Sequence, residues 1–247
     1  MTTIEIVSYL NNLTDKVRLD LTQQLINEST SDIMLFSGHT LGFVNDIEEL
    51  RTQIKNKRVE VILELRSINS DKFGNCLYRV SKGNLFSLNT NQLFATSREI
   101  EGNYELARRL IYEFQSHRIL TIKGYKFLTL QCGELNILKN IQSDNNRVEF
   151  RLSDDLQLTE KFEQIIKETN IFLNPIHSPM ANQGKMQKRR EYLTINKRYY
   201  FSTSNTKEDS DNLSLRSLQY AFYNGLRLKQ INSKMTTNSI SRIFEIK

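Results

Sequence analysis

The sequence has few cysteines, prolines and glycines. Of its 247 residues, two are cysteines, two are prolines and nine are glycines. Two thiols do not make a disulfide framework, and the chain has no Cys-x-x-Cys pair of the kind that holds structural zinc. So few prolines and glycines argue against a long disordered linker. We therefore expect a folded chain without disulfides, and the sequence indicates no metal and no cofactor.

Long apolar runs are also missing. No segment approaches the roughly 18 consecutive apolar residues that a membrane helix needs. Glu5 interrupts the N-terminus, where a secretion signal would be apolar. Hydrophobic residues make up 38% of the chain and charged residues 25%, as in ordinary globular proteins. We therefore expect a soluble cytoplasmic protein with no membrane partner.

The net charge of +6, from 34 basic and 28 acidic residues, is mildly basic and diffuse. One stretch, Lys185–Arg198, concentrates basic residues and runs into the tyrosines Tyr199 and Tyr200. Basic side chains interleaved with aromatic ones can hold single-stranded nucleic acid. A charged helix face that is simply solvated explains the same pattern. Nucleic acid is therefore a possible partner that the composition does not require.

The hydrophobic pattern predicts alternating helices and strands. At the N-terminus, Leu10, Leu13, Val17, Leu21 and Leu25 recur at helical spacing. Further helices are predicted at Asp46–Lys57, Asn103–His117, Glu160–Asn170 and Gln183–Ile195. Strands are predicted at Asp32–Phe36, Val59–Leu65, Ile171–Pro175 and Arg198–Ser204, with hairpins at Asn75–Asn89, at Arg118–Cys132 and near the C-terminus.

This alternation favours an α/β architecture with mixed sheets. In such sheets, ligands bind beyond the carboxyl ends of the strands. The residues just past predicted strand ends are Gly38 and His39, then Cys132 and Glu134, then His177. These positions hold two of the three histidines and one of the two cysteines. They are the candidate site.

Five segments, in this order, resemble the nitrilase, or carbon–nitrogen hydrolase, superfamily. The resemblance covers nearly the whole chain and implies a four-layer α-β-β-α sandwich with mixed sheets. It implies a single domain over residues 1–247, with a small insert at about 141–158, that forms a homodimer or joins a hetero-complex. The segments are "SDIMLFSGHTLG" (31–42), "LYRVSKGNLFSLNTNQLF" (77–94), "IKGYKFLTLQCGELN" (122–136), "ETNIFLNPIHSP" (168–179) and "KRREYLTINKRYYFSTSN" (188–205).

The family's chemistry uses a cysteine nucleophile, a glutamate acid–base and a lysine that stabilises the tetrahedral intermediate. By the resemblance, Cys132 is the cysteine and Glu134 the acidic residue that supports its loop. Gly38 stands where the family has its glutamate, and Thr90 stands where it has its lysine. Losing either role costs orders of magnitude in rate.

These departures favour a degenerate hydrolase, a pseudoenzyme that serves as a binding or assembly subunit. The alternative is an active thiol amidase that uses Cys132 with substitute partners on a small-molecule amide. In that hypothesis His39 forms a thiolate–imidazolium pair with Cys132, Glu134 orients a histidine ring, and Gly38, Thr90 and His177 line the substrate pocket. A third interpretation is a subunit of a nucleic-acid-associated complex.

Bland interpretations of the same residues stay open. Cys132 can be a small buried hydrophobe, His39 can cap its loop, and His177 can contact backbone between the two prolines. Lys123 and Lys126 precede Cys132 in the chain, but solvent exposure is the expectation for both. Glu60 and Glu64 lie inside a predicted strand, and we expect them on a solvated or layer-facing side.

Overall fold

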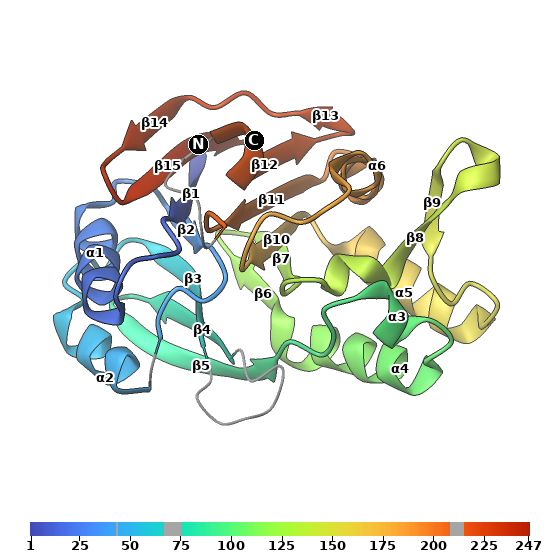
Figure 1. The fold of residues 1–247 in the computed structure, drawn as a ribbon, viewed down its shortest axis with the longest axis horizontal. Helices are drawn as coiled ribbons and strands as arrows, with labels where there is room; N and C mark the ends of the chain where they lie inside the picture. The colour runs from blue at the N-terminus through green and yellow to red at the C-terminus, as the bar shows by residue number, and fades with distance from the viewer. Residues whose placement is uncertain (43, 67–75, 208–214) are drawn as a thin grey trace.

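A computed structural model describes residues 1–42, 44–66, 76–207 and 215–247. Two mixed sheets pack face to face, and helices cover their outer faces (Figure 1). The predicted mixed α/β class is confirmed. The first sheet has the strand order β14-β15-β1-β2-β3-β4-β5 and the second the order β13-β12-β11-β10-β7-β6.

Three neighbouring strands in the middle of each sheet run parallel. In the first sheet these are β1, β2 and β3, and in the second β7, β10 and β11. The remaining pairings are antiparallel. The first sheet comprises β1 (Thr2–Tyr9), β2 (Ile33–Phe36), β3 (Glu60–Leu65), β4 (Cys76–Ser81), β5 (Asn84–Asn91), β14 (Asn232–Met235) and β15 (Ser239–Ile246). The second comprises β6 (Ile119–Ile122), β7 (Tyr125–Thr129), β10 (Ile171–Ile176), β11 (Tyr199–Ser204), β12 (Gln219–Tyr223) and β13 (Leu226–Arg227).

Three apolar clusters separate the four layers. One, which includes Leu35 and Phe201, fills the space between the two sheets. A second joins the first sheet to α1 (Asp15–Glu28) and α2 (Val44–Gln53). The third joins the second sheet to α4 (Tyr104–Glu113), α5 (Leu156–Glu168) and α6 (Gln183–Thr194). The short helices α3 (Ser97–Ile100) and α7 (Leu215–Leu218) complete the α-helical set of the described residues.

The helix predicted from the leucine spacing is confirmed as α1, but it starts later than the leucines suggest, and the strand before it was not predicted. Residues Thr2–Tyr9 form β1, which pairs with β2 and β15 in the middle of the sheet, and the helix starts only at Asp15. The Thr14 side chain caps that helix by accepting a hydrogen bond from the Val17 amide. Val17 is 40% exposed, whereas Leu19 and Ile26 are buried. The leucine spacing therefore marks the buried face in part, since Leu25 lies in the core and Leu21 packs against it.

Most other predicted elements are confirmed within a few residues. The hairpin predicted from Asn75 forms as β4 and β5, although Asn75 itself lies outside the described residues. The helix predicted to reach His117 leaves α geometry at Phe114 and continues as a π-helix through Arg118. The exposed strand β14, with the polar sequence NSKM, carried no apolar signal and was missed.

A separate two-stranded sheet, β8 (Leu138–Ile141) and β9 (Arg147–Phe150), follows the loop that carries Cys132. It projects from the body of the molecule at the right of Figure 1 and overlaps the segment predicted as an insert. None of the described helices combines the length and apolar character required to cross a bilayer.

Candidate active site

The carboxyl ends of the parallel strands bring the candidate residues to one edge of the sandwich. Gly38 and His39 follow β2 in the first sheet, whereas Cys132 and His177 follow β7 and β10 in the second. The Gly38 amide donates to the Ile176 carbonyl oxygen at 3.0 Å, which ties the two sheets together at this edge. As the strand-end rule predicts, these residues lie at one edge of the two sheets.

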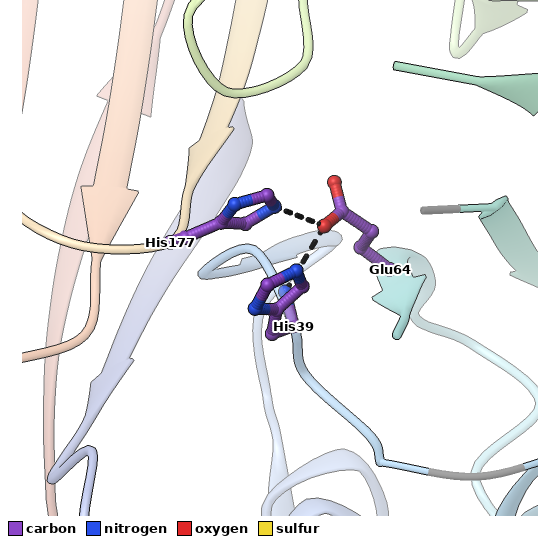
Figure 2. A group of neighbouring side chains, drawn as sticks. All are labelled: His39, Glu64 and His177. Carbon is purple, nitrogen blue, oxygen red and sulfur yellow. Dashed lines mark hydrogen bonds and ion pairs between the residues drawn. The ribbon is translucent and has the colours of Figure 1, made fainter. Parts of the chain in front are cut away.

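Glu64, near the end of β3, organises the two histidines (Figure 2). Its side chain is fully buried, and Oε1 lies 2.6 Å from Nε2 of His177. The same oxygen accepts the His39 backbone N–H at 3.1 Å, and Oε2 accepts Nε2 of Gln131 at 3.0 Å. The rings of His39 and His177 stack with centroids 3.5 Å apart and an angle of 15° between their planes.

This contact network fixes the charge on His177. Burial alone would lower the pKa of His177, but the Glu64 carboxylate and the Cys132 thiol, which hydrogen-bonds to the same ring, raise it to about 10. Burial would likewise raise the pKa of Glu64, but the charges of His177 and His39 and the hydrogen bonds from His177 and Gln131 lower it. At neutral pH the site therefore holds an imidazolium between a buried carboxylate and a half-buried thiol.

Gly38 makes room for His177. A Cβ placed at position 38 would lie 2.4 Å from Cδ2 of His177, well inside van der Waals contact, and 3.0 Å from the Ile176 carbonyl carbon. The Gly38 carbonyl oxygen accepts Nδ2 of Asn205 at 2.8 Å, which anchors the loop after β2 to the residue after β11. At the position that the sequence resemblance assigned to the family's glutamate, the space beside the backbone is therefore filled by the imidazole ring of a different element.

The Glu134 side chain anchors the loop that carries Cys132. This carboxylate is fully buried and accepts the backbone N–H groups of Gln131 at 2.8 Å and Leu93 at 2.9 Å. The intervening Gly133 has a φ of +82°, and a Cβ there would lie 2.3 Å from the Ala95 carbonyl oxygen. Glycine is therefore required for the turn that presents Cys132.

A buried arginine links Glu134 to Thr90. Arg118 is fully buried, and its Nη1 pairs with the Glu134 carboxylate. Its Nε donates to Oγ1 of Thr90 at 2.7 Å and its Nη2 donates to the Asn91 carbonyl oxygen at 2.6 Å. The position that would carry the family's lysine is thus occupied by a threonine whose hydroxyl accepts a hydrogen bond from this guanidinium.

The structure rearranges the predicted roles. It places Cys132, His39 and His177 together, but the ring that hydrogen-bonds to the thiol is that of His177. Glu134 lies with Arg118, and Glu64 is the carboxylate that orients a ring. Of the two positions expected for Glu64, the solvated one is wrong, because its side chain is fully buried.

Glu64 and Arg118 are the two residues that sequence reasoning missed. Glu64 is the next-to-last residue of a strand parallel to β2, so the strand-end rule could have included it. Arg118 carried no such signal. The predicted exposure of Lys123 and Lys126 is confirmed, since their side chains are 43% and 48% exposed and pair with Asp32 and Glu168.

The geometry of His39, Glu64 and His177 favours a hydrogen-bonded cluster over a metal centre. Their possible ligand atoms all lie within 4.8 Å of one another. However, the two rings lie in nearly parallel planes 3.5 Å apart. A nitrogen lone pair lies in the plane of its ring, so one ion cannot meet both lone pairs unless a ring turns.

The basic stretch Lys185–Arg198 is divided by burial. Arg189 is buried against Asn136 and Asn140, and Arg190 is buried over the ring of Tyr220 in the second sheet. Tyr199 and Tyr200 are buried in β11. Bases therefore cannot stack on these two tyrosines. Lys188 of α6 is exposed, as is Lys197 just after the helix. Their exposure fits the alternative interpretation of solvated charges.

Comparison with known proteins places this geometry in a known architecture. No family model and no curated protein matches the sequence. Among solved structures, the NitN amidase from Nesterenkonia sp. AN1 matches over 100% of this chain and 93% of its own, with a TM-score of 0.60 and 9% identity. Another structure of an amidase from Nesterenkonia sp. matches over 99% and 90%, with a TM-score of 0.59 and 10% identity. XC1258 from Xanthomonas campestris, a CN-hydrolase superfamily protein, matches over 99% and 91%, with a TM-score of 0.53 and 13% identity.

At these identities the likeness shows the fold. The chain has the nitrilase-like, carbon–nitrogen hydrolase fold, and the predicted α-β-β-α sandwich is confirmed. The resemblance stated from the sequence segments is thereby borne out as a distant relationship of fold.

Proposed function

We propose that this chain is a thiol-dependent hydrolase of carbon–nitrogen bonds in small amides. The observation that carries the proposal is the placement of the His177 ring between the buried Glu64 carboxylate and the Cys132 thiol. A nucleophile, a base beside it and a third group that orients the base is the general arrangement for covalent catalysis. The sequence alternative of an active thiol enzyme is kept, with His177 in the place first given to His39.

The proposed reaction has two halves that balance in atoms and protons. The Cys132 thiolate adds to the amide carbon, the carbon–nitrogen bond breaks, and His177 gives its proton to the departing amine. Water then adds to the thioester as His177 takes a proton from it. The carbon–sulfur bond breaks, a carboxylic acid leaves, and the thiolate is restored. The net change is amide plus water to acid plus amine.

The electrostatics support a change of role for His177 during this cycle. The thiol is one of the groups that raise the pKa of His177 to about 10. Acylation replaces this sulfur group by a neutral thioester that no longer supports the raised pKa, so the imidazolium then loses its proton more readily. The base needed for hydrolysis of the thioester is therefore produced by formation of the thioester itself.

The oxyanion of the tetrahedral intermediate would be stabilised less strongly than by the family's lysine. Thr90 carries no charge, and the Arg118 guanidinium is directed at Thr90, Asn91 and Glu134. Loss of one oxyanion donor typically costs about 100- to 1,000-fold in kcat. We therefore expect slower turnover than an enzyme with the family's lysine, and accumulation of the acyl-enzyme is the more sensitive observable.

Two structures of a mutant amidase from Nesterenkonia sp. AN1 suggest the probes. One shows the Michael addition of acrylamide, and the other the covalent addition of the acetamide moiety of fluoroacetamide, at the active site cysteine of that protein. We would incubate the present protein with each compound and follow intact mass and peptide masses. Addition at Cys132, with none at Cys76, supports the proposal. The Cys132→Ser protein is the control that must stay unmodified.

A panel of amides and nitriles, with ammonia release as the readout, then tests turnover. Ammonia release that disappears in Cys132→Ser supports the hydrolase. No modification and no ammonia from any member would overturn it.

The degenerate hydrolase that the sequence favours is the second candidate. It is supported by Gly38 and Thr90 at the two family positions and by the engagement of Arg118. In this case Cys132 is inert and the chain is a binding or assembly subunit. Light scattering of the purified protein tests the expected homodimer, and co-purification tests a hetero-complex. Binding of nucleic acid through Lys185–Arg198 would show as a steep dependence of affinity on salt.

A further inference from the structure

A cavity of about 500 Å³ opens beside the His39–His177 stack. Its wall includes His39, His177, Arg66, Lys207 and Asn11. We propose that this cavity binds the anionic group of the substrate, so that the substrate is a small amide that also carries a carboxylate. This inference rests on the proposed function, because it assigns the substrate class of the same site.

The charge of the wall carries the argument. Arg66 and Lys207 are cations, His177 is an imidazolium at neutral pH, and within the described part of the chain no carboxylate lines the cavity. Glu64, the nearest acidic group of the site, is buried behind His177 and accepts hydrogen bonds from His177, His39 and Gln131. A concave surface that combines several charges of one sign concentrates ligands of the opposite sign.

A further cation lies beneath this wall. Arg18 is buried and donates to three carbonyl oxygens, those of His39 at 3.0 Å and of Leu10 and Asn11 at 3.2 Å each. Burial lowers the pKa of Arg18, nearby Tyr9 and Asp15 raise it, and the charge of Arg66 lowers it. Because carbonyl oxygens carry no net charge, the three hydrogen bonds do not neutralise Arg18, although the Asp15 carboxylate offsets part of its charge.

The position of His177 connects the cavity to the reacting group. One ring both lines the cavity and hydrogen-bonds to the Cys132 thiol. An anionic group held by Arg66 and Lys207 would therefore leave the amide end of the same molecule near Cys132. The volume lies within the range of about 300–1,000 Å³ that small-molecule sites occupy. A short dicarboxylic acid monoamide, such as succinamate, has both groups in one small molecule.

Calorimetric titration of the Cys132→Ser protein tests the inference without turnover. The probes are succinamate, its neutral counterpart butyramide, succinate, and inorganic phosphate. Each probe is titrated into the Cys132→Ser protein and into the same protein with Arg66→Ala, Lys207→Ala or Lys161→Ala added. Lys161 is the matched control, since it is an exposed lysine of α5 that does not line the cavity.

We expect succinamate to bind about tenfold or more tightly than butyramide, because a charge-assisted hydrogen bond is lost with the neutral compound. The difference should shrink in Arg66→Ala and Lys207→Ala, stay in Lys161→Ala, and decrease with added salt. Binding of phosphate in place of succinate and succinamate would overturn the carboxylate and assign the cavity to phosphorylated ligands. Equal binding of succinamate and butyramide, or no effect of either cavity variant, would overturn the inference.

The two proposals fail separately. If the thiol is acylated by amides but charge does not matter, the anionic substrate is wrong and the hydrolase stands. If succinate binds through Arg66 and Lys207 while Cys132 is inert, the hydrolase is wrong, and the cavity is the ligand site of a non-catalytic protein.

Discussion

The imidazole of His177 occupies the space that a side chain at position 38 would fill, since a Cβ on Gly38 would lie 2.4 Å from Cδ2 of His177. The two positions therefore depend on each other: the His177 ring fits after β10 because position 38, after β2, has no side chain. A glutamate at position 38 and the His177 ring in its present position exclude each other. Where the sequence resemblance placed the family's glutamate, this chain thus has another proton-carrying group, the imidazole of His177.

We predict that Gly38→Ala disturbs the site by displacing His177. Overpacking of this kind typically costs about 1–3 kcal/mol of unfolding free energy. It should also slow alkylation of Cys132, because the imidazolium moves away from the thiol. The matched control is Gly184→Ala in α6, where an added Cβ would meet nothing within 4 Å. That change should be neutral or stabilise by up to about 1 kcal/mol. Denaturant unfolding and alkylation rates check both, and equal stability of the two variants would refute the steric conflict.

Cys132 should be the more reactive of the two cysteines at neutral pH, and its reactivity should depend on His177. An imidazolium beside a thiol favours the nucleophilic thiolate. In contrast, burial and the negative charge of Glu64 raise the pKa of Cys76, whose thiol donates to Oδ1 of Asn91 at 2.9 Å. We expect His177→Gln to slow alkylation of Cys132 by about tenfold or more, and to leave Cys76 unchanged.

Peptide mass spectrometry after timed alkylation measures both thiols in one sample, with Cys76 as the internal reference. His39→Ala is the companion variant, because it removes the ring that stacks on His177 and keeps the backbone N–H that donates to Glu64. His39→Ala should slow alkylation of Cys132 less than His177→Gln does. A larger effect of His39→Ala than of His177→Gln would restore the original hypothesis of a Cys132–His39 pair.

The sequence was sufficient to predict that Cys132 and His177 lie close together, because both follow apolar segments that form buried strands ending at one edge. Glu64 was harder to assign, because it lies one residue before the end of its strand and not past it. Its strand, β3, is buried over five of its six residues, so alternation does not mark which side chains face the site. Its role depends on β2 and β10 lying close to it, which is a tertiary relationship. Arg118 was missed for a similar reason, since it ends a π-helix that the helical period did not reveal.

The ion pair of Glu64 and His177 should make stability depend on pH in a defined window. His177 has a pKa raised from its ordinary 6.5 to about 10 in the folded protein. Its contribution is therefore fully present below pH 6.5 and is lost as the pH rises through about 10. The pKa of Glu64 is lowered from 4.5, so its contribution is present above pH 4.5 and is lost as the pH falls below that value.

Thermal unfolding from about pH 5 to about pH 11, a range that includes the titration of His177, checks this sign in the unsubstituted protein and in His177→Gln. Near neutrality the variant should be less stable by up to about 3 kcal/mol, since it leaves Glu64 buried without its cationic partner. The difference between the two proteins should shrink as the pH rises through 10. A difference that grows with pH over that interval would contradict the charged pair.

Arg118 and Glu134 should act on stability and on the position of the Cys132 loop, and take no part in proton transfer. Both side chains are fully buried, so Arg118→Met leaves a buried carboxylate without its partner and should cost about 3–5 kcal/mol. The exposed pair of Arg147 and Asp144 is the control, and Arg147→Met should cost less than about 1 kcal/mol. The double variant Arg118→Met/Glu134→Leu should be less destabilised than the sum of its single changes, because no charge is then left unpaired. If Glu134 instead acted on a histidine, Glu134→Gln would change the pH dependence of Cys132 alkylation, whereas a supporting role changes its rate and leaves the pH dependence alone.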